Sequence, residues 1–349
     1  MTISTADNPN IRYTGRVDHS DPRAPSFAFP GVCIEACFEG HEISLLLSDT
    51  GDQNYFEVEI DNLPPQVFQS AKGLTTWAVA AHLTSGPHTV RIVKRTEALC
   101  GVTTFHGFQL ADGARLVAPA APLGKRLEFI GDSITCGYGN MVSTYHPQDF
   151  PFTPANENNS LSWGALTAQA LDAQYVAVAY SGRGLMRNFD GTEAGTLPEI
   201  YASIFPDTPG KAAWDMAAYC PDVLVINLGT NDYYSQLTRK DLSDEAFDAR
   251  FADTYRHFLT RLRQHHGPTT RMVCAVGPML SDDADNRFWS RIQSAVSGVV
   301  DNVRSQGDLR VYYLVLSPQE PPFGEDWHPS AATHARMAKT TAEYIRPLL

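Results

Sequence analysis

The stretch "RLEFIGDSITCGYG", Arg126–Gly139, decides the fold of the second part of the chain. An apolar run that includes Leu127, Phe129 and Ile130 stops abruptly at Gly-Asp-Ser. Near-continuous apolar runs are typical of parallel strands that are buried on both faces. Aspartate and serine are also good helix N-caps, so Ser133 is either a nucleophile or simply the cap of a helix. The rest of the sequence has to decide between these two interpretations.

Beyond this stretch, apolar strands alternate with long helical patterns. The expected strands are "LEFI", "YVAVAY", "DVLVINLG", "RMVCAVGP" and "RVYYLVLS". The expected helices are "SLSWGALTAQALDA", "SDEAFDARFADTYRHFLTRLRQHH", "DADNRFWSRIQSAVSGVVDNVRSQ" and "SAATHARMAKTTAEYI". This alternation predicts an α/β domain over residues 124–349, with a mainly parallel sheet as the middle of three layers.

The first part of the chain has the periodicity of strands instead. Apolar and polar residues alternate in "VCIEACFEGHEISLLLSD", "YFEVEIDN", "WAVAAHL", "HTVRIVKRTE" and "TTFHGFQL", and turn residues separate these runs. Short strands at regular spacing predict an antiparallel β-sandwich over residues 1–123. The stretch "ADGARLVAPAAPLGKR" is rich in Ala, Pro and Gly and reads as a linker, with the boundary near Leu123.

Charge and composition exclude several classes of partner. The formal net charge of −12 over 349 residues argues against nucleic acid, which requires a basic face, and against an anionic membrane surface. A neutral substrate fits this charge better. The six cysteines show neither a C-x-x-C pair nor the spacing of zinc ligands, and Cys33 and Cys37 do not by themselves predict a disulfide. The sequence therefore predicts no metal site.

The N-terminal residues "MTISTADNPNIRYTGR" lack the basic head and apolar middle of a secretory signal. No apolar run has the length of about 18–20 residues that spans a bilayer. The sequence as it stands predicts a cytoplasmic protein, or a secreted one if a signal peptide has been removed. It does not predict an oligomeric state.

Polar and small residues follow four of the expected strands, at the sheet edge where doubly wound proteins place their sites. The candidates are Ser133, Gly182 or Gly184, Asn231 and His328. Each has an ordinary structural explanation: a strand-end glycine is often a turn residue, Asn231 could close a turn, and "HPS" could only start a helix. Their occurrence together, in order, favours a catalytic site.

These residue types suit acyl transfer. A serine hydroxyl attacks a carbonyl when a base such as histidine takes its proton, and a carboxylate or carbonyl on the other ring nitrogen orients that base. Glycine N–H groups and an asparagine amide can stabilise the oxyanion that results. Two carboxylates, Glu325 and Asp326, immediately precede His328.

The segments "GDSIT", "SGRG", "GTND" and "DWHP" resemble the four blocks of the SGNH, or GDSL-type, hydrolases. Over nearly the whole chain the sequence is similar to family 2 of the carbohydrate esterases. That resemblance implies a jelly-roll domain ahead of an SGNH domain, and removal of acetyl groups from polysaccharides such as xylan and glucomannan. It implies a carboxylic ester hydrolase that needs no cofactor, with an acetylated glycan as its substrate.

The resemblance assigns roles to residues of this chain. Ser133 becomes the nucleophile and His328 the base, while Ser133, Gly184 and Asn231 form the oxyanion hole and Gly182 is a weaker candidate. The wider SGNH pattern has an aspartate three residues before the histidine, where this chain has Glu325. Family 2 resembles this chain in placing its acid two residues before, at Asp326. Asp326 is thus the expected orienting acid, with Glu325 or a main-chain carbonyl as the alternative.

The substrate side is predicted less sharply. Trp327, Tyr138 and Trp289 are the aromatic residues expected to bind sugar, although core packing is the alternative for each. Bulky residues after the glycines, Leu185 and Met186 among them, suggest a pocket that accepts little more than a methyl group. Two other functions stay open. One is a GDSL-type lipase, lysophospholipase or thioesterase for longer acyl chains, and the other is a carbohydrate-binding protein with an inert second domain.

Overall fold

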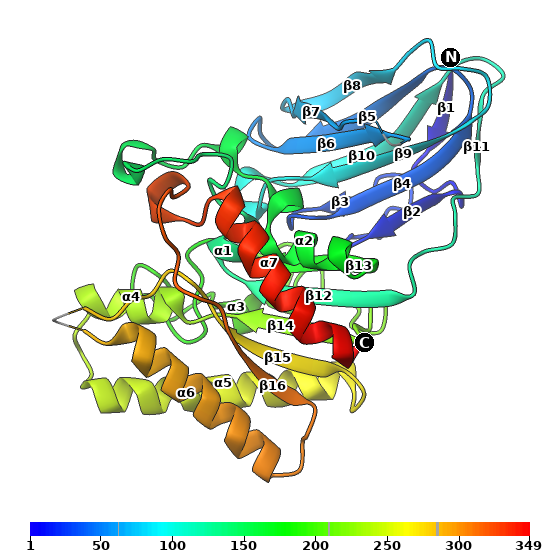
Figure 1. The fold of residues 1–349 in the computed structure, drawn as a ribbon. Coiled ribbons are helices and arrows are strands. Elements are labelled where there is room, and N and C mark those ends of the chain that lie inside the picture. Colours follow the sequence, from blue (N-terminus) through cyan, green and yellow to red (C-terminus); the bar gives the residue numbers. More distant parts are fainter. Residues whose placement is uncertain (62, 209, 284–285) are drawn as a thin grey trace. The chain divides into compact units, whose positions relative to one another are not determined.

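The computed structural model describes residues 1–61, 63–208, 210–283 and 286–349. The chain forms two compact units (Figure 1). The first comprises Met1–Pro122 and Ser203–Trp214, and the second comprises Leu123–Ala202 and Asp215–Leu349. The segment Ser203–Trp214, which lies in the second half of the chain, therefore belongs to the strand-rich first unit.

The first unit consists of two antiparallel sheets. One contains β1 (Thr2–Thr5), β10 (Thr103–Leu110), β5 (Ile43–Asp49) and β8 (Gly73–Ala80) in that order, with β3 (Ser26–Phe27) also paired to β10. The other contains β11 (Arg115–Val117), β4 (Cys33–Glu39), β9 (Pro87–Lys94), β6 (Tyr55–Ile60) and β7 (Gln66–Gln69), with β2 (Ile11–Thr14) paired to β4. Side chains from both sheets, such as Leu45 and Phe105 from one and Phe38 and Phe56 from the other, share one buried core. This confirms the predicted β-sandwich.

The alternating segments of the sequence form β4, β5, β6, β8, β9 and β10 as predicted. The expected linker is only partly a linker, because Arg115–Val117 pairs with Cys37–Glu39 as strand β11. Its three residues are too few to show a periodicity, so the pattern of alanine and proline around them hid this strand. Five short strands, β1, β2, β3, β7 and β11, were missed for the same reason.

The second unit is built on a parallel sheet of β13 (Ala173–Ala179), β12 (Lys125–Gly131), β14 (Val223–Asn227), β15 (Arg271–Val276) and β16 (Val311–Val315), in that order. All of its pairings are parallel. Every residue of β14 is buried, as its continuous apolar sequence predicts. The five strands are those expected from the sequence.

Helices connect these strands. They are α1 (Ser133–Cys136), α2 (Trp163–Ala170), α3 (Leu197–Ile200), α4 (Thr230–Thr238), α5 (Asp244–His266), α6 (Phe288–Ser305) and α7 (Ala331–Ile345). The four expected helices are confirmed as α2, α5, α6 and α7, except that residues 284–285 of the third expected helix lie outside the described residues. Ser243 caps α5 by accepting a hydrogen bond from the Ala246 N–H.

The strand order places Ser133 at a topological switch point. β12 lies between β13 and β14, so the chain leaves it on one side and returns on the other. Crevices open at the carboxyl ends of strands where the order reverses. The residues that follow β12, β13 and β14 therefore meet at one edge of the sheet, and these are the segments that carry Ser133, Gly182 and Asn231.

Two further observations concern the described residues. None of their helices is long and apolar enough to cross a membrane. All six cysteines are free thiols.

Gly131 ends β12 and leaves no room for a side chain. A Cβ there would overlap Thr135 Oγ1 and lie 2.7 Å from Thr135 Cβ, and Thr135 is itself buried. We expect Gly131→Ala to lower the free energy of unfolding by about 1–3 kcal/mol, because overpacking displaces the turn that carries Ser133. The matched control is Gly298→Ala in α6, where nothing lies within 4 Å. It should leave stability unchanged or raise it by up to about 1 kcal/mol. Urea unfolding of both variants measures the difference, and equal stabilities would contradict the prediction.

Candidate active site

Ser133 is not the cap of its helix. The cap of α1 is Asp132, whose carboxylate accepts a hydrogen bond from the Ile134 N–H at 3.0 Å. Ser133 occupies the first helical position, where a backbone N–H has no intrahelical acceptor. Gly137, with φ 87°, ends the helix after a single turn. The turn therefore presents both the Ser133 hydroxyl and its N–H at the end of β12.

His328 contacts this hydroxyl. Its Nε2 lies 2.8 Å from Ser133 Oγ, although 195 positions separate the two residues in sequence. The other ring nitrogen, Nδ1, lies 3.0 Å from the Asp326 carbonyl oxygen and 3.2 Å from the Glu325 carbonyl oxygen. Carbonyls only accept hydrogen bonds, so Nδ1 carries the proton and Nε2 is left to accept the proton of the serine. This is the tautomer that a general base requires.

The orienting group is the main chain, which corrects the assignment of the Asp326 side chain. Among the residues that the structure describes, the Asp326 carboxylate has no hydrogen bond to the imidazole, whereas its carbonyl oxygen has one. The Glu325 carboxylate is engaged elsewhere, since it accepts from the Thr153 N–H at 2.9 Å and from Asn156 Nδ2 at 2.6 Å. The alternative of a main-chain carbonyl thus describes this site.

An unusual backbone turn produces this arrangement. Asp326 (φ 45°) and Trp327 (φ 64°) both lie in the left-handed region, which costs about 1–2 kcal/mol per residue that is not glycine. Hydrogen bonds hold the turn from both sides: the Gly324 N–H donates to the His328 carbonyl at 2.7 Å, and the Asp326 N–H donates to the Phe150 carbonyl at 3.0 Å. The side chain of Glu325, the residue at which the turn begins, is buried. Strain of this kind persists where surrounding contacts over-determine the conformation.

The protein around His328 disfavours its charged form. Desolvation lowers the pKa of the imidazole to about 4, against a partial opposing effect of the two carbonyl hydrogen bonds. Tyr138 contributes to this burial because its ring stacks on the imidazole at a centroid distance of 3.9 Å. The ring of Phe152 packs against that of Tyr138, with a centroid distance of 4.5 Å. At neutral pH the base is therefore unprotonated.

The two glycines of "SGRG" differ in their N–H groups. The Gly184 N–H donates to Asn188 Oδ1 at 3.2 Å, so the N–H that we assigned to the oxyanion already has an acceptor. Within the described residues, the Gly182 N–H has no such partner, and a Cβ built on Gly182 (φ 75°) would lie 3.9 Å from Phe189 Cβ. Gly182 is therefore the donor that would release no existing bond on meeting an oxyanion, whereas Gly184 would release its bond to Asn188, just as Asn231 would release its bond to Asp132. Asn231 approaches the same region, since its Nδ2 donates to the Arg183 carbonyl at 2.9 Å and to Asp132 Oδ2 at 3.2 Å.

Asp232 holds the loop that follows these glycines. Its buried carboxylate accepts three hydrogen bonds, of 2.7–2.9 Å, from the N–H groups of Leu185, Met186 and Arg187. Burial raises the pKa of this carboxyl to about 6, and the three N–H donors act against that rise. Asp132 and Asp232 thus both bind backbone amides beside the site. Asn188, which accepts from the Gly184 N–H, carries no signal in the sequence, because asparagine is also common in ordinary turns.

The three aromatic residues that were expected to bind sugar, Trp327, Tyr138 and Trp289, differ in their position relative to Ser133 and His328. Trp327 remains beside the base with 49% of its surface exposed, and its ring lies 5.4 Å from that of Phe323. Tyr138 buttresses the imidazole, a role that the sequence did not suggest. Trp289 lies in the first turn of α6, and the described part of the chain gives it no ring contact or hydrogen bond with Ser133 or His328. Leu185 and Met186 are buried in the protein, which removes the argument that they crowd the acyl group.

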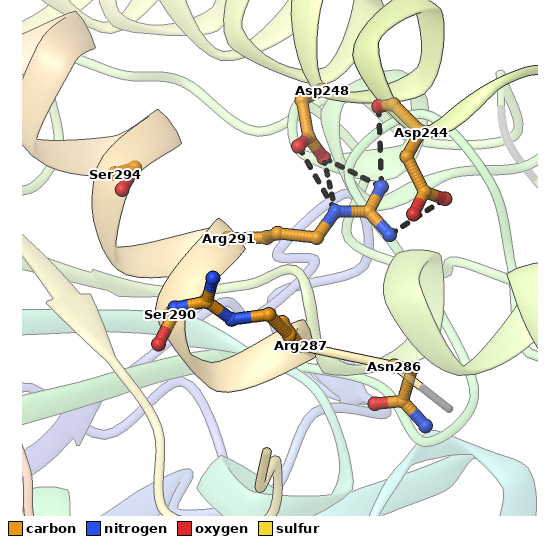
Figure 2. A pocket seen from close by; sticks show the side chains of 7 residues that line it. All are labelled: Asp244, Asp248, Asn286, Arg287, Ser290, Arg291 and Ser294. Atoms are coloured by element: carbon orange, nitrogen blue, oxygen red, sulfur yellow. Dashed lines mark hydrogen bonds and ion pairs between the residues drawn. The ribbon is translucent and has the colours of Figure 1, made fainter. Parts of the chain in front are cut away.

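A separate pocket of about 530 Å³ lies at the first turns of α5 and α6 (Figure 2). Its central cation, Arg291, is paired with Asp244 at 2.7 Å and with Asp248 at 2.9 Å. The lining residues are Asp244, Asp248, Asn286, Arg287, Ser290, Arg291 and Ser294. No histidine or cysteine is among them, so neither Ser290 nor Ser294 has an imidazole in this pocket that could take its proton. The contact between Ser133 and His328 is the better candidate for chemistry.

Comparison with known proteins identifies the family of this chain. Residues 13–120 match the family described as Carbohydrate esterase 2 N-terminal, and residues 129–336 match the GDSL-like Lipase/Acylhydrolase family. An "Acetylxylan esterase / glucomannan deacetylase" of Cellvibrio japonicus is 30% identical over 94% of this chain and 87% of its own length. The chain belongs to family 2 of the carbohydrate esterases.

Other relatives of this carbohydrate esterase family 2 chain extend the likeness. It is 37% identical to "Cellulase/esterase CelE" of Acetivibrio thermocellus over 97% of its length, but it spans only 39% of that protein. A structure of a family two carbohydrate esterase from Clostridium thermocellum in complex with cellohexaose matches with a TM-score of 0.87 at 36% identity. That match covers 97% of this chain and 98% of the other.

The first prediction concerns the orienting group. Because the Asp326 carbonyl rather than its carboxylate contacts His328, we expect Asp326→Asn to lower kcat/KM on an acetyl ester by less than about 10-fold. An orienting carboxylate would cost about 10⁴-fold. Asparagine tolerates the left-handed region, so the turn is preserved. The companion variant Glu325→Gln should be the more damaging, since it loosens the anchor at Thr153 and Asn156. A loss of 10³-fold or more in a folded Asp326→Asn protein would restore the carboxylate to the mechanism.

The second prediction concerns pH. The folded protein keeps His328 neutral down to a pKa of about 4, so kcat/KM should hold between pH 7 and 5 and fall tenfold per unit below about 4. An unfolded chain binds this proton near pH 6.5, so stability declines as the pH falls from 6.5 towards 4. Rates should therefore be measured only where the near-UV circular dichroism is unchanged. An acid limb centred at 6.5 or above would show that the imidazole is not desolvated.

Proposed function

We propose that this chain is a serine esterase that removes O-acetyl groups from plant polysaccharides or their oligosaccharides. The observation that carries the proposal is the 2.8 Å contact between Ser133 Oγ and His328 Nε2, in the tautomer that leaves Nε2 free to accept a proton. Nucleophile and base within hydrogen-bond reach, with the base oriented by a third group, are the signature of nucleophilic catalysis.

The reaction follows from this geometry. His328 takes the proton of Ser133, and Oγ attacks the acetyl carbonyl carbon. The resulting oxyanion is stabilised by the N–H groups of Ser133 and Gly182 and by the Asn231 side-chain amide. To donate to the oxyanion, this amide gives up its 3.2 Å hydrogen bond to Asp132. His328 then gives its proton to the departing sugar hydroxyl. Water, deprotonated by the same imidazole, attacks the acetyl-enzyme and releases acetate, so neither metal nor organic cofactor is required.

Acetylated xylan or glucomannan is the substrate class that the relatives' names and the charge support. Two relatives are named acetylxylan esterase and glucomannan deacetylase, and the net charge of −12 suits a neutral glycan. The alternative of a lipase-like enzyme for long acyl chains predicts a broad apolar groove. The alternative of an inert binding protein predicts a broken catalytic pair, whereas here the pair is assembled.

Two measurements test the proposal. We expect Ser133→Ala to abolish acetate release from acetylated xylan without loss of folding, because the nucleophile is gone. Ser294→Ala, an exposed serine of the second pocket, should retain full turnover. On 4-nitrophenyl esters from acetate to octanoate, kcat/KM should be highest for acetate, the acyl group in the relatives' names, should tolerate propionate, and should decline steeply from butyrate onward. Turnover by Ser133→Ala, or a profile that rises towards octanoate, would overturn the deacetylase assignment.

A further inference from the structure

A second histidine is buried near the catalytic pair, and the mechanism described above gives it no role. His334 lies in the first turn of α7, and none of its surface is exposed. Desolvation, and to a smaller extent the positive charge of a protonated His328, lowers the pKa of its imidazole to about 3. The two imidazoles are therefore close enough to interact, and His334 is neutral wherever His328 is.

One hydrogen bond fixes the tautomer of His334. The Trp163 backbone N–H donates to His334 Nδ1 at 3.1 Å, so Nδ1 carries no proton and Nε2 carries it. Trp163 is the first residue of α2, which packs beside α7 (Figure 1), and its N–H has no acceptor within its own helix. Because a buried N–H needs an acceptor, His334 supplies from α7 the group that α2 lacks.

The Trp163 side chain extends this connection to the nucleophile. Its indole Nε1–H donates to Thr135 Oγ1 at 3.3 Å, and Thr135 stands two positions after Ser133 in the single turn of α1. The indole is fully buried and packs edge-on against Phe129 of β12, with a centroid distance of 4.9 Å and an interplanar angle of 90°. A rigid, buried ring thus joins the acceptor on α7 to the turn that carries Ser133.

The helix that carries His334 also begins beside the base. α7 starts three positions after His328, and the N–H of its first residue, Ala331, donates to the carbonyl of buried Asn140 at 2.9 Å. The His334 N–H donates to the Ser330 carbonyl at 3.0 Å, which holds the imidazole to this first turn. The segment of the base and the turn of the nucleophile are therefore joined through α7 as well as through their direct contact.

The imidazole is retained at a cost in stability. Among the residues that the structure describes, His334 Nε2 has no hydrogen-bond acceptor, although it is buried and carries the proton. A buried donor without an acceptor is unfavourable. An apolar residue of similar size would avoid this loss but would leave the Trp163 N–H without its acceptor. Unpaired buried groups in native proteins call for an explanation, and they are expected at sites where function takes precedence over local stability.

We propose that His334 is a positioning residue of the esterase reaction, which in its neutral Nε2–H tautomer ties the helix that follows the base to the turn that carries the nucleophile. The inference rests on the proposed function. His334 does not touch the reacting atoms; it acts through Trp163 and Thr135 on the position of the Ser133 hydroxyl. Attack and proton transfer depend on that position, whereas binding of the substrate does not, so loss of His334 lowers kcat rather than raising KM.

The test compares His334→Leu, which removes the acceptor, with His334→Asn, whose side-chain carbonyl oxygen can take the place of Nδ1. On 4-nitrophenyl acetate at pH 7, His334→Leu should lower kcat tenfold or more, up to about 10²-fold, with KM within about threefold. His334→Asn should recover most of this loss. The matched control is Thr341→Val, which removes a buried hydrogen bond of α7 to the Met337 carbonyl and should leave kcat within about twofold.

A second variant tests the connection itself. Trp163→Phe keeps the backbone N–H that His334 accepts and removes only the indole donor to Thr135, so it should lower kcat in the same way. Because both changes interrupt one chain of contacts, the double variant with His334→Leu should lose no more than the worse single variant. Losses that multiply would overturn the connection. Should His334→Leu not fold, an unchanged kcat in Trp163→Phe overturns it alone.

Labelling of Ser133 by a fluorophosphonate separates positioning from substrate specificity, because it reports the activation of the nucleophile without any ester. His334→Leu should be labelled tenfold or more slowly than the wild type, while His334→Asn and Thr341→Val should stay within about threefold. Unchanged labelling and kcat in a folded His334→Leu protein would overturn the positioning role even if the protein releases acetate. A wild-type protein that is not labelled at Ser133 would instead refute the proposed function, before any variant of His334 is compared.

Discussion

The hydrogen bonds from His328 Nδ1 to two main-chain carbonyls are the interaction on which the rest of the site depends. They fix the tautomer and direct Nε2 at Ser133, but they bring no full negative charge to the imidazole. A base of this kind, with a pKa near 4, is neutral at pH 7 and intrinsically weak. The negative charge that develops on the oxyanion beside it must therefore help to stabilise the imidazolium. In the proposed mechanism no carboxylate shares this task, unlike in a triad with a buried aspartate.

The architecture concentrates the four functional segments at one place. Since β12 lies between β13 and β14, the turns after these three strands meet at the same edge of the sheet. The base comes from the segment after β16, and a strained turn anchored by Glu325 directs it at Ser133. Asp132, Asp232 and Asn188 add hydrogen bonds to the turns that carry the donors. The reacting groups are thus held by short-range hydrogen bonds rather than by exposed ion pairs.

Much of this was predictable from the sequence, for reasons that differ between residues. Ser133 and the strands around it follow from apolar runs that end in small polar residues, a local signal. The choice between Gly182 and Gly184 was not predictable, because it depends on where the Asn188 side chain reaches. The choice between the Asp326 carboxylate and its carbonyl depends on the positive φ angles of Asp326 and Trp327, which the residue types at these positions do not predict.

The orientation of His328 by a carbonyl has an evolutionary consequence. A main-chain oxygen is present whatever residue occupies position 326, so the aspartate there is not bound by the requirement to align the base. Selection can use its side chain for other purposes, provided that the residue adopts the left-handed turn. Divergent enzymes with the same catalytic geometry could therefore lack an acid next to the histidine, and a motif that demands one would fail to recognise them.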